Sequence, residues 1–168
     1  MAEKVLVTYG SKHGATAEIA QKIGAVLSES GLAVDVLPAE KVTSVAPYAG
    51  VVLGSGVYAG QWVSSAAEFL TQQESALAQR PVWLFSSGPT GEGDPLVLLK
   101  GWRVPEKLQP VADRIQPRDM AVFGGKMDPQ TLSLPERLII KMIKAPMGDF
   151  RDWQAISEWA SGIGAALR

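Results

Sequence analysis

The chain has 168 residues, of which 46% are hydrophobic and 20% are charged. This length suits a single domain, residues 1–168, with a core of its own. Sixteen Lys and Arg residues against seventeen Asp and Glu residues leave a net charge of -1, which argues against nucleic acid as a partner. The absence of cysteine excludes disulfides, thiolate nucleophiles and Fe–S ligation, so redox chemistry would need a bound cofactor. We expect no metal site.

The first ten residues, MAEKVLVTYG, lack the charged, apolar and small-residue pattern of a cleaved leader. No apolar run approaches the eighteen residues that a membrane span needs. Together with the absence of cysteine, these features predict a cytoplasmic protein.

Five short apolar runs alternate with longer segments of helical periodicity. The runs are Lys4–Tyr9, Ala33–Leu37, Gly50–Ser55, Pro81–Ser86 and Met120–Gly125. Four of them are nearly continuous, as expected for strands covered on both faces, whereas the alternating run AVDVL suits an edge strand. The sequence therefore predicts five strands of a largely buried sheet.

The segments between these runs predict helices. Apolar residues between Ile19 and Leu27, and again between Ile156 and Leu167, recur at helical spacing. Ser65 and Glu68 have the spacing of a capping box before another helix. Alternating strands and helices predict an α/β fold with a doubly wound parallel sheet and helices on both faces.

The segment YGSKHGATAEIA joins the first predicted strand to the first predicted helix. Its backbone amides, the helix dipole and the hydroxyls of Ser11 and Thr16 suit a phosphate group, and Gly10 and Gly14 permit close approach. The spacing fits neither a Walker loop nor the three-glycine Rossmann fingerprint. The alternative is that these residues only cap the helix.

Two further loops at the same edge of the sheet are rich in glycine. GSGVYAGQW, residues 54–62, contains Tyr58 and Trp62, and SSGPTGEGDP, residues 86–95, follows the fourth strand. Backbone polar groups beside an aromatic side chain suit a flat ring system. We expect Tyr58 to contact such a ring, whereas core packing is the competing interpretation for Trp62.

Residues 126–150, here called the insert, separate the fifth strand from the last helix. If LPERLIIKMIKA is helical from Pro135, its basic residues share one face and its apolar residues the other. The basic residues are Arg137, Lys141 and Lys144, and the apolar ones are Leu138, Ile139, Met142 and Ile143. Such a helix suits an anionic membrane or a pocket for an apolar, anionic substrate. The alternative is that it packs its apolar face on its own domain.

The segment YGSKHGATAEIA resembles the FMN phosphate loop of the flavodoxin superfamily, with His13 in place of a common Thr. VLGSGVYAGQW, the insert and DWQAISEWASGIGAAL resemble the branch that contains the menaquinone-dependent protoporphyrinogen IX oxidases. The resemblance implies a flavodoxin-like five-stranded sheet of order 2-1-3-4-5. It also implies FMN as the cofactor.

The resemblance and the three loops together place the cofactor-binding residues, but they assign no catalytic residue. Those residues are Ser11, Lys12, His13, Gly14, Ala15, Thr16, Ser55, Gly56, Val57, Tyr58, Ala59, Gly60, Trp62, Ser86, Ser87, Gly88 and Pro89. His13, the sole histidine, lies beside the expected phosphate and is a poor candidate for a general base.

The near-neutral charge distinguishes this chain from electron-shuttle flavodoxins, which are typically strongly acidic. We therefore expect an FMN-dependent oxidoreductase with a quinone or a redox protein as its electron partner and a tetrapyrrole as a candidate substrate. Residues 134–145 would provide peripheral contact with the inner face of the membrane. The alternative is a flavodoxin that shuttles electrons between a reductase and a redox partner.

Overall fold

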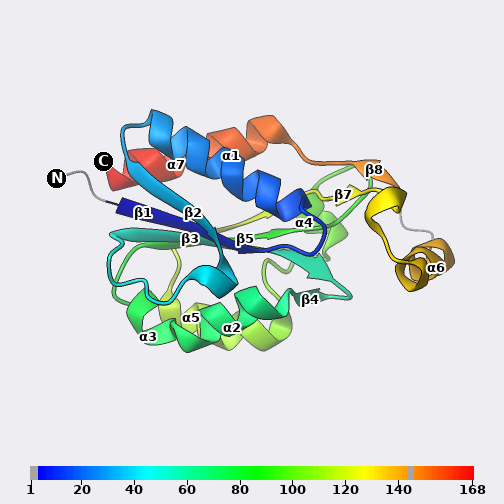
Figure 1. The fold of residues 1–168 in the computed structure, drawn as a ribbon, viewed down its shortest axis with the longest axis horizontal. Coiled ribbons are helices and arrows are strands. Elements are labelled where there is room, and N and C mark those ends of the chain that lie inside the picture. The colour runs from blue at the N-terminus through cyan, green and yellow to red at the C-terminus, as the bar shows by residue number, and fades with distance from the viewer. Residues whose placement is uncertain (1–3, 144–145) are drawn as a thin grey trace.

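The computed structural model describes residues 4–143 and 146–168. Its centre is a sheet of five parallel strands in the order β2-β1-β3-β5-β6 (Figure 1). The strands are β1 (Lys4–Gly10), β2 (Ala33–Pro38), β3 (Gly50–Tyr58), β5 (Val82–Ser87) and β6 (Asp119–Phe123). Numbered along the chain, this is the expected order 2-1-3-4-5, so the predicted fold is confirmed.

Helices cover both faces of this sheet (Figure 1). On one face lie α1 (Ala15–Glu29) and α7 (Trp153–Leu167), and on the other lie α2 (Ser64–Gln72), α3 (Glu74–Leu77) and α5 (Gln109–Ile115). The apolar stripe of α1 explains its position, because Ile19, Ile23 and Leu27 are completely buried. Each face of the sheet therefore has its own hydrophobic core.

The three central strands are buried on both faces, which explains their continuous apolar sequences. Val52 and Leu53 of β3 point to opposite faces and are both completely buried. Their neighbour Gly54 provides space for Phe85 of β5, since a Cβ atom at Gly54 would lie 2.0 Å from that ring. Packing therefore requires glycine at this position of the strand.

The segment 54–62, which we expected to be a loop, is a strand, a turn and a second strand. β3 continues to Tyr58, and β4 (Gln61–Trp62) pairs back on it in antiparallel fashion. The two turn residues, Ala59 and Gly60, have φ angles of 50° and 75°, as a tight hairpin turn requires. Tyr58 consequently extends from a paired strand and not from a flexible loop.

The capping box expected at Ser65 and Glu68 is wrong. α2 begins at Ser64 after Val63, and no side chain caps it. The remaining short elements are η1 (Ala39–Lys41), α4 (Pro95–Leu98) and η2 (Glu106–Leu108). Asp94 caps α4, because its carboxylate accepts a hydrogen bond from the backbone amide of Leu96 at 2.9 Å.

The insert forms a small substructure at one end of the sheet (Figure 1). It consists of β7 (Lys126–Met127), η3 (Pro129–Thr131), α6 (Leu134–Ile143) and β8 (Gly148–Asp149). β7 and β8 pair in antiparallel fashion, and α6 projects beyond the main layers. The helix expected from Pro135 is therefore present, although Lys144 lies outside the described residues.

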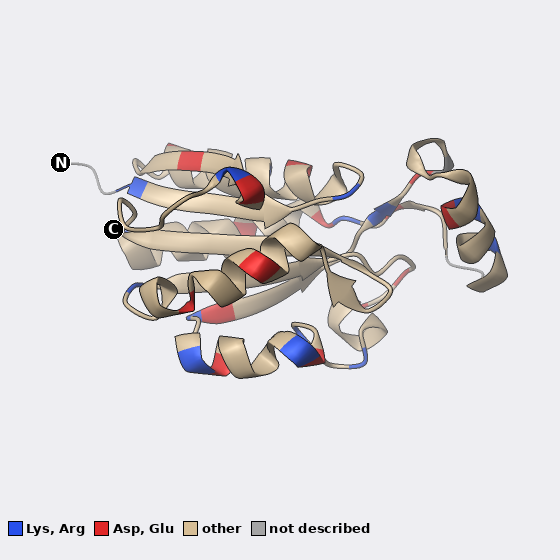
Figure 2. Ribbon diagram, turned by 60° about the horizontal axis from the view of Figure 1, so that its bottom comes forward, with Lys and Arg blue, Asp and Glu red and all other residues tan. Residues whose placement is uncertain are grey.

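Charges of both signs are distributed over the layers and the projecting helix (Figure 2). None of the helices in the described ranges combines the length and the hydropathy needed to cross a bilayer. The most exposed apolar side chains of α6 are those of Met142 and Leu134, which are 81% and 72% exposed. The insert thus contrasts with the sheet in leaving apolar surface open to solvent.

Candidate cofactor-binding site

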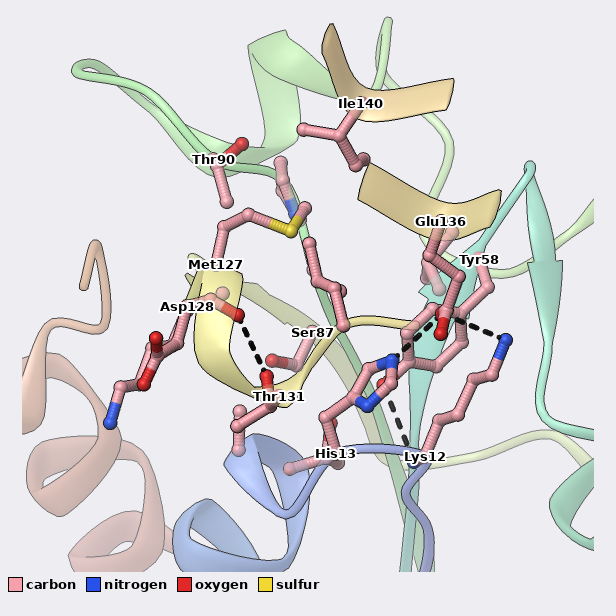
Figure 3. A pocket seen from close by; sticks show the side chains of 18 of the residues that line it. Lys12, His13, Tyr58, Ser87, Thr90, Met127, Asp128, Thr131, Glu136 and Ile140 are labelled. Carbon is pink, nitrogen blue, oxygen red and sulfur yellow. Dashed lines mark hydrogen bonds and ion pairs between the residues drawn. The ribbon is translucent and has the colours of Figure 1, made fainter. Parts of the chain in front are cut away.

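A cavity of about 390 Å³ lies where β1, β3 and β5 end. This volume falls within the range of small-molecule and cofactor pockets. Its walls come from the loop after β1, the β3–β4 hairpin and the loop after β5, and the insert closes it from above (Figure 3). The cavity therefore occupies the switch point of the sheet, where doubly wound folds bind ligands.

The loop between β1 and α1 presents a helix N-terminus to this cavity. α1 begins after Gly14, whose φ angle is 91°, and no side chain caps it. Its first backbone amides consequently lack intrahelical acceptors. Thr16 lines the cavity at 2% exposure, and its hydroxyl has no hydrogen-bond partner among the described residues. Uncapped amides beside a hydroxyl fit a phosphate group.

Ser11 stabilises the shape of this loop, because its hydroxyl oxygen accepts a hydrogen bond from the amide of Gly14 at 3.1 Å. Opposite the loop stands Tyr58, whose hydroxyl oxygen accepts a hydrogen bond from the amide of Lys12 at 3.3 Å. Burial raises the pKa of Tyr58, which therefore remains protonated at neutral pH. A Cβ atom at Gly56 would lie 2.8 Å from the Tyr58 ring, so glycine permits this ring position.

The upper part of the cavity is apolar and comes from the insert. Ile139, Ile140 and Ile143 of α6 line it, together with Met127 of β7 and Leu132. Ile140 points from α6 toward the cavity in Figure 3. One half of the cavity therefore offers polar groups for an anion, while the other half offers an apolar surface.

Glu136 connects these two halves. Its Oε2 atom lies 3.0 Å from Nζ of Lys12 and 2.9 Å from Nε2 of His13 (Figure 3). Its pKa lies well below the usual range. The main cause is the hydrogen bond that the Ser133 backbone amide donates to the carboxylate, and the second is the hydrogen bond from the Lys12 side chain. An ionised carboxylate thus lies directly above the loop between β1 and α1.

Of the predicted cofactor-binding residues, the structure brings ten together around the cavity. They are Lys12, His13, Ala15, Thr16, Val57, Tyr58, Ala59, Ser87, Gly88 and Pro89. The other seven are outside the lining: Ser11, Gly14, Ser55, Gly56, Gly60, Trp62 and Ser86. The cavity therefore collects parts of all three predicted loops.

Three of these seven side chains stabilise the loops from behind. Trp62 is 5% exposed, and its indole nitrogen donates a hydrogen bond to the Ser86 hydroxyl at 2.8 Å. Ser86 in turn donates to the carbonyl of Arg103. The Ser55 hydroxyl oxygen accepts from the amide of Val63 at 2.9 Å. For Trp62, this arrangement agrees with the packing interpretation.

Sequence reasoning missed Glu136 and Ile140 as parts of the site, whereas Ile139 and Ile143 were expected on a helix that suits either a membrane or a substrate pocket. One signal was available for Glu136, because Ser133 and Glu136 have capping-box spacing just before an apolar segment. Its contact with His13, 123 residues away in sequence, had no such signal.

The comparisons with known proteins identify the family and the fold. A family model described as "Flavodoxin domain" matches residues 6–154. A comparison with curated protein sequences gives no match.

Several solved structures share the fold at low sequence identity. A flavodoxin from the domain Archaea is 13% identical with a TM-score of 0.66, and 98% of each chain is covered. The two-electron reduced flavodoxin of Megasphaera elsdenii is 20% identical with a TM-score of 0.59, covering 94% of this chain and 98% of that one. Rubredoxin oxygen:oxidoreductase of Desulfovibrio gigas is 13% identical with a TM-score of 0.62, covering 98% of this chain and 36% of that one.

Proposed function

Since this chain belongs to the flavodoxin domain family, whose cofactor is FMN, we propose that it is an FMN-dependent oxidoreductase with an apolar, anionic substrate of its own. Members of this family transfer electrons to redox partners. Within the family, the proposal assigns the chain to the branch of the menaquinone-dependent protoporphyrinogen oxidases. A tetrapyrrole would then be the substrate, and a quinone the electron acceptor.

The proposed position of FMN follows from the polar half of the cavity. Residues 11–16 would bind the phosphate through the uncapped amides of α1 and the hydroxyl of Thr16. Tyr58 and the loop beginning at Ser87 would flank the flavin ring. Support comes from the fact that these groups converge on one cavity of suitable volume.

The observation that carries the substrate proposal is the apolar roof of the cavity, which we define as the residues of α6 that line it. A shuttle that only docks on protein partners does not require an apolar subsite beside its cofactor. Here Ile139, Ile140 and Ile143 provide such a surface, next to Lys12, whose ammonium pairs with Glu136 at 3.0 Å and would exchange this partner for the anionic group of a substrate. An apolar body with a carboxylate edge complements these groups.

When bound, FMN supplies hydride and single-electron transfer. The residues of the chain would bind the phosphate, position the ring and provide the apolar surface of the other half of the cavity. Each oxidation step would remove two electrons and two protons from the substrate, and one quinone would take them up to become a quinol. Three such steps, with three quinones, would convert a porphyrinogen into a porphyrin.

Contact with a membrane is part of the same proposal. Leu138 and Met142 are 59% and 81% exposed, and Lys141 belongs to the same helix. The alternative, a helix packed on its own domain, would have buried these apolar side chains. Exposed apolar residues with adjacent basic residues suit an anionic bilayer surface, where apolar quinones reside.

The test is anaerobic reduction of the FMN-loaded protein by protoporphyrinogen and then reoxidation with a menaquinone analogue. Flavin absorbance measures both steps. We expect Ile140→Ser, which changes the roof, to raise KM for the substrate. Leu138→Ser is the matched control, because Leu138 is on the same helix but outside the cavity lining.

A flavodoxin shuttle predicts a different outcome in the same assay. Its FMN would be reduced by a flavodoxin reductase and not by protoporphyrinogen, at rates that fall steeply with salt. That result would refute the oxidase proposal and leave the family assignment intact.

A further inference from the structure

The two carboxylate oxygens of Glu136 make different contacts. Its Oε1 accepts a hydrogen bond from the amide of Ser133 at 3.1 Å, while the amide of Glu136 donates to the Ser133 hydroxyl at 3.3 Å. This reciprocal pair is a capping box at the start of α6. Its other oxygen, Oε2, contacts Lys12 and His13 of the phosphate loop. The residue that caps the roof helix therefore also joins it to the loop below.

Apart from the contacts of Glu136, α6 packs little against the protein core. None of its described residues is buried, although Ile139, Ile140 and Ile143 face the cavity. The segments on both sides of α6 are better anchored. Leu132 is 8% exposed, and Asp149 forms a 2.7 Å ion pair with Arg151, whose side chain is 4% exposed. α6 is thus a roof between two fixed attachments.

A bound phosphate would conflict with the contact of Glu136. A phosphate monoester carries about −1.5 to −2 charges at pH 7. On the loop of residues 11–16 it would approach the same two side chains, the ammonium of Lys12 and the ring of His13, that now contact the carboxylate. Two anions that share donors at short distance repel each other, and partial burial weakens solvent screening.

We propose that Glu136 is an internal anion beside the phosphate site, so that binding of the FMN phosphate and docking of α6 oppose each other. The proposal rests on the assignment of the phosphate to residues 11–16. Binding of FMN releases the Glu136 contact and loosens the roof, which opens the apolar half of the cavity. Because coupling between two sites is reciprocal, removing the charge of Glu136 strengthens phosphate binding.

Glu136→Gln tests this directly, since glutamine keeps the capping box but removes the charge. Apoprotein is titrated with FMN and with riboflavin, which lacks the phosphate, and flavin fluorescence is recorded. We expect the Kd for FMN to fall about tenfold, within the usual range of coupling between sites, and the Kd for riboflavin to stay within twofold. Glu106→Gln is the control, because it changes the net charge equally at a residue outside the cavity lining.

Hydrogen exchange of residues 134–143 provides the second measurement. In the parent protein, saturating FMN should increase exchange in α6. In Glu136→Gln, exchange should already be high and change little on addition of FMN. Protection of α6 by FMN in the parent protein, or an equal change in the affinities for FMN and riboflavin, overturns the proposal.

Thr16→Ala separates the two ways in which the proposal can fail. If Thr16→Ala leaves FMN affinity unchanged, the phosphate assignment is wrong and the inference falls with it. If Thr16→Ala weakens FMN binding but Glu136→Gln does not strengthen it, the phosphate assignment stands and only the opposition between phosphate and roof is refuted.

Discussion

The central sheet and the insert contribute to the same cavity but are stabilised in different ways. The sheet completely buries side chains such as Leu53 and Phe85, whereas α6 of the insert has no buried residue among those described. Burial of apolar area dominates folding energetics, so the sheet is the stable part of the structure. Stability and site formation are therefore divided between two regions, and each can be changed separately.

The largest expected effect is on the sheet. Phe85→Ala removes a completely buried ring that contacts Phe123 and Trp159 at centroid distances of 6.0 Å. We expect the free energy of unfolding to fall by about 3–5 kcal/mol, measured by urea denaturation. Ile143→Ala on α6 is the comparison, and we expect a loss below about 1 kcal/mol for this exposed residue. Equal losses would contradict the division between the two regions.

The next effect concerns the cavity wall that the sheet positions. Thr16→Ala removes a cavity-lining hydroxyl at the start of α1. We expect FMN binding to weaken by about 0.5–1.5 kcal/mol, or more if the phosphate charge strengthens the hydrogen bond. Thr16→Ser keeps the hydroxyl and should retain most of the affinity in a fluorescence titration. If alanine and serine bind FMN equally well, the hydroxyl is not a phosphate ligand.

The sheet could be predicted from sequence because its interactions are local or periodic. A strand buried on both faces must be apolar at every position, and the runs around Val52 and Leu84 show this directly. The hairpin at residues 58–61 could not be predicted in the same way, because Ala59 adopts a positive φ that its residue type does not indicate.

The candidate site was predictable only in part, for a related reason. Lys12 and Thr16 follow β1 and Tyr58 ends β3, and both strands end at one edge of the sheet, so topology brings these residues together. The contact of Glu136 with the phosphate loop depends on how the insert folds back over the cavity. Side chains that are distant in sequence and joined by an irregular segment leave no periodic pattern to interpret.

A smaller effect, dependent on pH, is expected in the sheet region away from the insert. The hydroxyl of Tyr48 donates to Asp35 of β2 at 2.8 Å. The pKa of Tyr48 is raised from 10.0 to about 12, mainly by burial and secondly by this hydrogen bond. The folded protein therefore retains this proton to higher pH than the unfolded chain, so stability is present below pH 10 and declines as the pH rises toward 12.

Tyr48→Phe should lower the free energy of unfolding by about 1 kcal/mol at pH 8, because it removes the hydrogen bond to the carboxylate. Urea denaturation at several pH values should also show a smaller decline for the variant above pH 10. A decline identical to that of the parent would mean that other groups determine alkaline stability. Tyr9→Phe provides a control, since Tyr9 lies in β1 and has no hydrogen bond to a carboxylate among the described residues.

The smallest effect on stability is expected for the outer face of α6. Leu138→Gln with Met142→Gln replaces two exposed side chains, so the free energy of unfolding should stay within about 0.5 kcal/mol of the parent value. Sedimentation with vesicles rich in phosphatidylglycerol should nevertheless show weaker binding, because apolar area available for the bilayer has been removed. Val97→Gln on α4 is the matched control, since Val97 is 70% exposed but lies outside the insert. If the double variant binds vesicles as well as the parent does, α6 is not the membrane contact. If it instead unfolds much more easily, these side chains support the fold, and the sheet and the insert are less independent than their burial indicates.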